Sequence, residues 1–134
     1  MANYTANYGL HQWEPGDYFL RTDFNEDFKK IDQALGAVQS TKCEVVIGTY
    51  TGNGAARRTI SLGFTPRAVL VESADGRRTT NSGANGGLIL NGHALIVGGV
   101  TAAEIVSGGF AVTYVQYSAN LNANGDVFSY VAFK

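Results

Sequence analysis

The sequence is poor in cysteine, proline and net charge, and each shortage excludes a class of protein. A single cysteine, Cys43, rules out an internal disulfide and a cysteine-based metal site, and its place at the start of an apolar strand predicts a buried thiol. Two prolines accompany 17 glycines without a G-X-Y period, which excludes a collagen-like or proline-rich disordered chain. A formal net charge of -1 offers no electrostatic surface for nucleic acid, so we expect no nucleic-acid partner.

Long apolar runs and a basic leader are also missing. No stretch approaches the roughly 18 apolar residues of a membrane span, so we expect no membrane partner. The N-terminus MANYTANYGLHQW has neither a basic start nor an apolar run, so we expect no signal peptide. A chain of this kind that acts outside a cell would leave it by lysis or within a larger particle.

The composition changes near residues 39–42. Residues 1–42 hold six acidic residues but only three of the 17 glycines, whereas the chain from residue 43 onward is rich in glycine and β-branched residues. A length of 134 residues allows one domain with a real core and a short extension. We therefore predict an N-terminal docking part, residues 1–42, and a β-module, residues 43–134.

Aromatic and polar residues alternate along residues 1–21, around a Pro15-Gly16 turn signal, with neither a helical nor a strand period. This pattern predicts an irregular arm. Its bulky side chains could fill separate pockets on a partner, and they are Tyr4, Tyr8, His11, Trp13, Tyr18 and Phe19. The alternative is that these side chains cover the chain's own β-module.

A short helix, about residues 23–38, should follow the arm. Asp23 and Glu26 have the spacing of a capping box. Apolar residues then recur at 4-3-4-3 spacing, and they are Phe24, Phe28, Ile31, Leu35 and Val38. This spacing fits a heptad seam between chains, although it covers only about two of the three to four heptads that identify a coiled coil. The alternative is a helix that packs on its own domain.

From Thr41 onward the apolar pattern has a period of two. It predicts strands at residues 43–51, 57–62, 67–73, 87–91, 94–98, 104–107, 110–117 and 127–133. Turn dipeptides separate apolar runs at hairpin distance, and they are Asn53-Gly54, Asp75-Gly76, Asn91-Gly92 and Asn124-Gly125. Because no helical pattern lies between the strands, we predict a mostly β fold: an antiparallel β-sandwich of about eight strands, preceded by the arm and one short helix.

No group of residues indicates catalysis, a metal site or a cofactor. His11 and His93 lack metal-ligand spacing, and no serine or cysteine has the sequence context of a nucleophile. The acidic residues at the start of the helix, including Asp27, are interpreted as a solvated face that stabilises the helix dipole. The run 122–126 is interpreted as a turn, because it lacks the full calcium-loop series. A glycan-cleaving enzyme is disfavoured, since the carboxylates of the β-module stand in separate elements.

Two loops could recognise a ligand instead. The polar loop at residues 77–87 offers forked and amide donors suited to sugar hydroxyls, and the candidates are Arg77, Arg78, Asn81 and Asn85. Tyr117 with Asn120 is a second candidate, because a stacking aromatic beside an amide suits a sugar face. An ordinary solvated loop explains the same residues in both places.

Two parts of the chain resemble known phage proteins. The run NYGLHQWEPGDYFLRTDFNEDFKKIDQAL (residues 7–35) resembles the opening segment of structural proteins from phages and prophages of gut Firmicutes. The remainder looks like the small C-terminal β-modules of phage tail-fibre and receptor-binding proteins, through VIGTYTGNG, RTISLGFTPRAVLV, GGLILNG and FSYVAFK. The resemblance implies a virion component, commonly a homotrimer, without catalytic residues.

The residues and the resemblance together give one expectation and one alternative. We expect a non-enzymatic virion protein in which residues 1–40 attach to other virion proteins, the helix helps to assemble three chains, and the sandwich binds host-surface glycan. Because a long fibre shaft is lacking, a purely architectural head-decoration, head-fibre or tail-accessory protein is the alternative.

Overall fold

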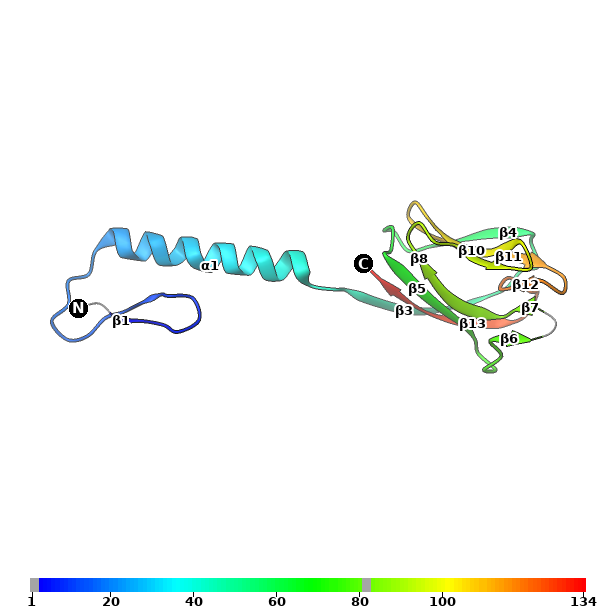
Figure 1. Ribbon diagram of the computed structural model, residues 1–134, viewed down its shortest axis with the longest axis horizontal. Helices are drawn as coiled ribbons and strands as arrows, with labels where there is room; N and C mark the ends of the chain where they lie inside the picture. Colours follow the sequence, from blue (N-terminus) through cyan, green and yellow to red (C-terminus); the bar gives the residue numbers. More distant parts are fainter. Residues whose placement is uncertain (1–2, 81–82) are drawn as a thin grey trace. The chain divides into compact units, whose positions relative to one another are not determined.

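The computed structural model describes residues 3–80 and 83–134, and its chain divides into two compact units, Met1–Lys42 and Cys43–Lys134. We call them the N-terminal unit and the β-unit. One helix belongs to the first, and two sheets that form a sandwich belong to the second (Figure 1). The predicted fold class, a mostly β chain with an antiparallel sandwich and a single helix, is confirmed.

The arm of the N-terminal unit contains a short hairpin where the sequence predicted only irregular structure. Strands β1 (Asn3–Tyr4) and β2 (His11–Gln12) pair antiparallel. Thr5 closes the loop between them, because its backbone N–H donates to Leu10 O at 2.9 Å and its carbonyl accepts from Gly9 N at 3.0 Å. Strands of two residues are too short to show a period of two, which explains why the pattern missed them.

Helix α1 spans Arg21–Thr41, so it is longer at both ends than the predicted 23–38. Its N-cap is Leu20, which makes no side-chain capping hydrogen bond, and Asp23 lies inside the first turn with its N–H directed to Leu20 O at 3.1 Å. The capping-box prediction was therefore wrong, although a carboxylate in the first turn still interacts favourably with the helix dipole. No helix within the described residues combines the length and the apolar character needed to cross a lipid bilayer.

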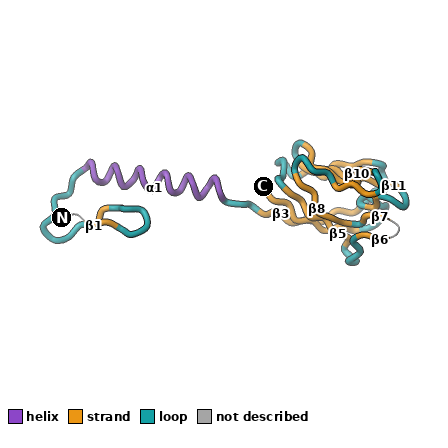
Figure 2. The backbone as a smooth tube through the Cα atoms, in the orientation of Figure 1, coloured by secondary structure: helices purple, strands orange, loops and turns teal. Residues whose placement is uncertain are grey.

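The β-unit consists of a four-stranded sheet and a larger sheet (Figure 2). The four-stranded sheet has the order β3 (Val45–Thr51), β13 (Val127–Phe133), β5 (Ala68–Ser73) and β8 (Gly86–Leu90). The larger sheet contains β9 (Leu95–Val97), β10 (Val100–Val106), β11 (Gly109–Val115) and β4 (Arg57–Ser61), together with the two-residue strands β12 (Ala119–Asn120), β7 (Gly83–Ala84) and β6 (Thr79–Thr80). The predicted strands correspond one to one to the described strands of three or more residues. Within residues 3–80 and 83–134, all strand pairings are antiparallel except that of β7 with β12, which is parallel.

Asn91-Gly92 closes a two-residue reversal, because Leu90 and His93 exchange backbone hydrogen bonds at 3.1 and 2.9 Å, whereas the other three turn dipeptides close no hairpin. Each leads the chain from one sheet to the other: Asn53-Gly54 from β3 toward β4, Asp75-Gly76 from β5 toward β6, Asn91-Gly92 from β8 toward β9, and Asn124-Gly125 from β12 toward β13. The tight hairpins are β9 with β10 and β10 with β11, which turn at Gly98-Gly99 and Ser107-Gly108. A glycine with positive φ reverses the chain whichever strand follows. The turn residues alone therefore do not identify which two strands pair with each other.

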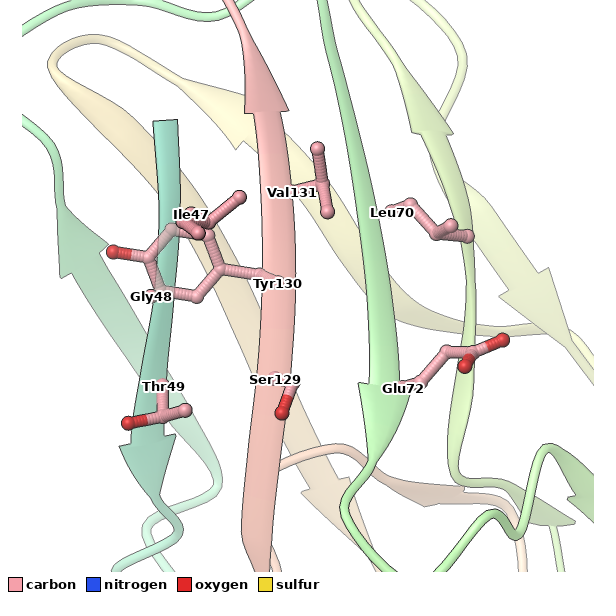
Figure 3. A pocket seen from close by; sticks show the side chains of 8 residues that line it. All are labelled: Ile47, Gly48, Thr49, Leu70, Glu72, Ser129, Tyr130 and Val131. Atoms are coloured by element: carbon pink, nitrogen blue, oxygen red, sulfur yellow. The ribbon is translucent and has the colours of Figure 1, made fainter. Parts of the chain in front are cut away.

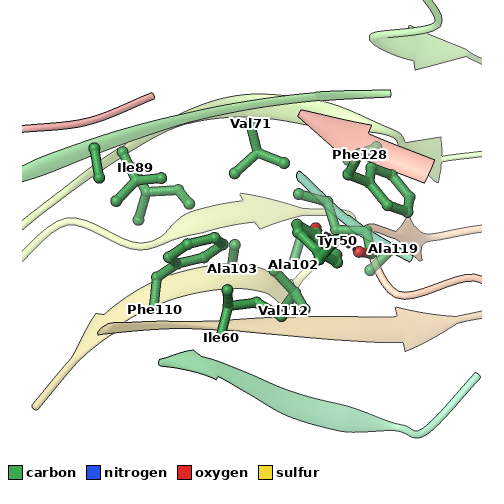
Figure 4. Packing of buried hydrophobic residues seen from close by; sticks show 14 residues of the cluster. Tyr50, Ile60, Val71, Ile89, Ala102, Ala103, Phe110, Val112, Ala119 and Phe128 are labelled. Atoms are coloured by element: carbon green, nitrogen blue, oxygen red, sulfur yellow. Dashed lines mark hydrogen bonds between the residues drawn. The ribbon is translucent and has the colours of Figure 1, made fainter. Parts of the chain in front are cut away.

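Aromatic rings contributed by both sheets lie at the centre of the sandwich (Figure 4). Tyr50 and Phe128 stack at 5.1 Å between ring centroids, and Phe110 meets Tyr50 at 6.1 Å and Tyr130 at 5.3 Å edge-on. The Tyr50 hydroxyl donates to Leu121 O at 2.7 Å, and burial raises the pKa of Tyr50 above its usual value. The polar end of this ring is thus satisfied inside the core.

Cys43 is exposed, which corrects the prediction of a buried thiol. It lies in the short segment between α1 and β3 and not within a strand. The apolar run that begins at Val45 therefore says nothing about the burial of the residue two positions before it.

Candidate functional site

The hairpin of the N-terminal unit is attached to α1 through His11. Asp27 accepts two hydrogen bonds from this residue, from the backbone N–H at 2.9 Å and from ring Nδ1 at 2.9 Å. The Lys30 ammonium lies 3.7 Å from the same carboxylate and donates to Gly9 O at 2.5 Å. Asp27 is buried, so its assignment to a solvated face was wrong. Burial alone would raise the pKa of Asp27, but the hydrogen bonds from His11 and the nearby charges of His11 and Lys30 outweigh it and lower the pKa.

In the contacts of the N-terminal unit, neither ring nitrogen of His11 faces a hydroxyl or a thiol. Nδ1 bonds to Asp27, and Nε2 lies 4.0 Å from a carboxylate oxygen of Asp23. A histidine that activates a nucleophile places one nitrogen against that nucleophile and the other against an orienting group. His11 instead has both nitrogens near acidic groups of one helix, an arrangement that attaches β2 to α1.

Four of the six predicted docking residues, Tyr4, His11, Trp13 and Phe19, form an aromatic row with Phe24. His11 lies 5.7 Å from Trp13, and Trp13 stacks on Phe19 at 5.1 Å and on Phe24 of α1 at 4.7 Å. Tyr4 contacts His11 at 4.9 Å. The row holds the arm on the helix, so part of the predicted docking set serves the N-terminal unit itself.

The remaining aromatic surface of the arm stays exposed. Tyr18 is 87% exposed, and Tyr4, Tyr8 and Phe19 each expose more than half of their surface. Exposed aromatic rings around a fixed stack are suited to filling pockets on another protein, since they carry large contact area at low entropy cost. The sequence identified these residues, but not which of them point inward.

The stripe predicted as a seam is largely uncovered, apart from Phe24, which stacks on Trp13 and Phe19 of the arm. Its five side chains, Phe24, Phe28, Ile31, Leu35 and Val38, are between 37% and 65% exposed. The only buried residue of α1 is Asp27, which is polar. In the described chain the helix therefore does not bury its apolar stripe, as the surface helix of a lone globular domain would.

The arginines of the predicted glycan loop are paired within the β-unit. Arg77 Nε lies 2.5 Å from Asp75 and its Nη2 lies 3.3 Å from Asp126, while Arg78 pairs with Glu72 at 2.6 Å. Hydrogen bonds from Ser73 and from the Arg77 backbone and side chain lower the pKa of Asp75, against a smaller opposing effect of burial. These guanidinium groups are at the surface, but their charge is already matched.

The amides of this loop differ in their placement. Asn85 is buried and its side-chain amide donates to Gly83 O at 3.3 Å, so it is not a surface contact for a ligand, contrary to the prediction. Asn81 lies outside the described residues. The loop thus offers Arg77 and Arg78 from the predicted set.

Tyr117 is an exposed member of the predicted glycan contacts. It is 73% exposed in the turn after β11 and has a positive φ of 64°. Asn120, half-buried, belongs to β12, which pairs with β11. A non-glycine residue in this backbone region is uncommon, and the turn holds the ring outward.

Sequence reasoning missed a hollow of about 510 Å³ on the outer face of the four-stranded sheet (Figure 3). It is lined by Ile47, Gly48, Thr49, Leu70, Glu72, Ser129, Tyr130 and Val131. The signal was present in the sequence, because VVI, VLV and LIL are continuous apolar runs inside strands whose overall pattern has a period of two. Such runs indicate a strand that is covered on both faces.

Among residues 3–80 and 83–134, no three histidine, cysteine or acidic side chains come together in a way that could hold a metal ion. Comparison with protein-family models, with curated proteins and with solved structures gives no match to this chain. The case for a function therefore depends on the surfaces described above.

Proposed function

We propose that this chain is a non-enzymatic component of a phage particle, of tail-fibre or receptor-binding type. In this proposal the N-terminal unit attaches to other virion proteins, α1 assembles three chains, and the β-unit is presented outward. The observation that carries the proposal is the exposed apolar stripe on α1, next to an arm with exposed aromatic rings. The likeness of residues 7–35 to the opening segment of phage structural proteins supports the same conclusion.

Self-association gives the stripe a partner of matching chemistry. Full burial of a large apolar side chain stabilises by roughly 1.5–3 kcal/mol relative to exposure. Five such side chains in each of three chains can offset the roughly 4–15 kcal/mol that association costs in lost freedom. The 4-3-4-3 spacing places them where parallel helices interdigitate.

The trimer can be tested by light scattering on the purified full-length chain. We expect three protomers for the natural sequence and dissociation for Phe28→Asp and Leu35→Asp, because a charge in the seam would lose its water. The matched control is Gln33→Asp, an exposed polar residue of the same helix, which should remain trimeric. A monomer at tens of micromolar for the natural sequence would rule out the seam.

Host-surface glycan is the ligand we propose for the β-unit, with Tyr117, Arg77 and Arg78 as contacts. The exposed ring suits stacking on a sugar face, and the paired arginines retain N–H donors for hydroxyls. A shallow site of this kind binds weakly, so three copies per particle component would supply avidity.

A purely architectural role is the second candidate. Its support is that Arg77 and Arg78 are neutralised by Asp75, Asp126 and Glu72, and that Asn85 is buried. Under this role the β-unit only packs on neighbouring virion proteins.

Binding to host cells and to purified wall polysaccharide distinguishes the two. We expect the full-length protein to bind, Tyr117→Ala to reduce binding at least several-fold, and Arg77→Ala with Arg78→Ala to weaken it further. Gln116→Ala, an exposed neighbour in the same turn, is the control. If the natural sequence binds neither cells nor polysaccharide, the architectural role replaces the receptor role.

A further inference from the structure

The outer face of the four-stranded sheet carries two adjacent apolar rows. In the first row, Ile47 of β3, Val131 of β13, Leu70 of β5 and Leu88 of β8 are directly opposite one another. In the second row the residues are Val45, Phe133, Ala68 and Leu90. We call these eight side chains the apolar sheet face.

Much of this face is open to solvent in the single chain. Ile47 is 75% and Leu88 54% exposed, and Val45, Leu70 and Leu90 are also exposed. The outward residues of β4 in the other sheet are instead polar: Arg57, Thr59 and Ser61. Since one face of an antiparallel sandwich strand is normally polar, β4 follows the expected pattern and the apolar sheet face does not. The contrast within one molecule indicates that the apolar sheet face has a partner.

The relief of this face provides both a projection and a depression. Ile47 stands beside the hollow, which continues past Leu70 to Glu72 and Ser129 (Figure 3). A surface with both features can contact another copy, because in a ring of three chains a projection of one chain can face a depression of the next.

Strand β3 is also an open edge. It pairs with β13 on one side over seven residues, and in the described chain no strand pairs with its other side. A long apolar edge strand with unpaired backbone groups joins other chains unless it is covered. The unpaired edge of β3 and the exposed side chains of Val45 and Ile47 therefore lie at the same place, where one partner could cover both.

We infer that the apolar sheet face and the β3 edge contact a second copy of this chain. The inference rests on the proposed trimer and extends it from α1 to the β-unit. The charges at the border of the face are paired with one another, Glu72 with Arg78 and Glu44 with Lys134. A charged polymer would thus find no matching charge there, whereas an identical apolar face is a chemical match.

Size favours the same occupant. A stable interface buries about 800 Å² on each partner, which is more than five exposed and three partly exposed side chains provide. The apolar sheet face therefore suits a second contact between chains that also meet elsewhere. In the proposed trimer the helical stripe is that other contact.

Thiol labelling of the full-length protein tests the inference. In a Cys43→Ser background, Ile47→Cys and Leu88→Cys place a thiol on the face, and Ile96→Cys places one on β9 of the other sheet. Ile96 is 61% exposed, so the single chain predicts similar reactivity at all three positions. We expect maleimide to react at least about tenfold more slowly at positions 47 and 88 than at position 96.

Dissociation identifies the source of the protection. Adding Leu35→Asp should release the protomers and restore fast labelling at positions 47 and 88. Equal rates at the three positions in a chain that light scattering shows to be trimeric would overturn this inference and leave the proposed trimer standing. Equal rates in a monomeric chain would overturn both. Protection that persists in a monomer would show local shielding and would overturn the inference alone.

Discussion

Asn122 is a buried polar side chain that joins two loops of the β-unit. Its Nδ2 donates to Asn53 Oδ1 and to Ala55 O, both at 2.8 Å, and its Oδ1 accepts from Asn53 N at 3.2 Å. The backbones approach closely at the same place, since a Cβ on Gly52 would lie 2.0 Å from Ala123 O. The amide side chain of Asn122 in the run 122–126 therefore has a structural role, because it joins the two loops.

Replacing Asn122 should destabilise the β-unit. We expect Asn122→Ala to lower the free energy of unfolding by about 1–3 kcal/mol, because it leaves buried donors and acceptors without partners. Asn122→Asp should also destabilise, since a carboxylate cannot donate to Ala55 O. Asn124→Ala, exposed in the same loop, should stay within about 0.5 kcal/mol. Urea unfolding measures all three, and equal midpoints for positions 122 and 124 would contradict this account.

At the level of elements, one buried carboxylate makes most of the polar contacts between the β1–β2 hairpin and α1. Asp27 accepts hydrogen bonds from His11 and lies near Lys30. The other charged group that faces the His11 ring is the carboxylate of Asp23. The pKa of Asp27 is lower in the folded chain than its ordinary value of 3.8. Its stabilising effect is therefore complete above the unfolded pKa and is lost as the pH falls through the folded pKa.

Acid should release the hairpin from the helix. Trp13, the only tryptophan, stacks on Phe24 and His11, so its fluorescence reports the contact. We expect the emission to change as the pH falls below about 3.8, and we expect Asp27→Asn to show the altered emission already at neutral pH. Asp32→Asn, on an exposed position of the same helix, should behave as the natural sequence. An unchanged Trp13 signal in Asp27→Asn would exclude this role.

At the scale of the whole molecule, the two units have separate cores. The core cluster of the β-unit draws its residues from Tyr50 to Ala132, and none comes from residues 1–42. The N-terminal unit is held by its own aromatic row and by the His11–Asp27 contact. In the proposed function, attachment to the particle can therefore be assigned to the N-terminal unit and ligand presentation to the β-unit.

Removal of the arm should separate these roles. Deleting residues 1–20 is expected to abolish incorporation into particles and to leave the urea midpoint of the β-unit unchanged, because the deletion takes nothing from its core. Particle incorporation is measured by co-sedimentation and the midpoint by circular dichroism. A lower midpoint would mean that the arm stabilises the sandwich, and docking by the arm would then lose its support.

The local pattern of the sequence was sufficient for helix α1 and for the strands of three or more residues, but not for the two-residue strands. A period of two predicted the strands because their alternate residues enter one core, as Tyr50 and Phe128 do. The 4-3-4-3 stripe predicted the helix and its apolar side, since residues three and four apart share a helix face. It did not identify the N-cap, because Asp23 suits both a cap and a first turn.

Only the tertiary structure decided which groups meet. The His11–Asp27 contact spans 16 residues, the Arg77–Asp126 pair 49 and the Asn122–Asn53 contact 69. The burial of Asn85, the exposure of Cys43 and the sheet-crossing role of the turn dipeptides depend on the same long-range packing. Propensity and periodicity act over a few neighbouring residues, whereas burial and pairing depend on what the rest of the chain places nearby.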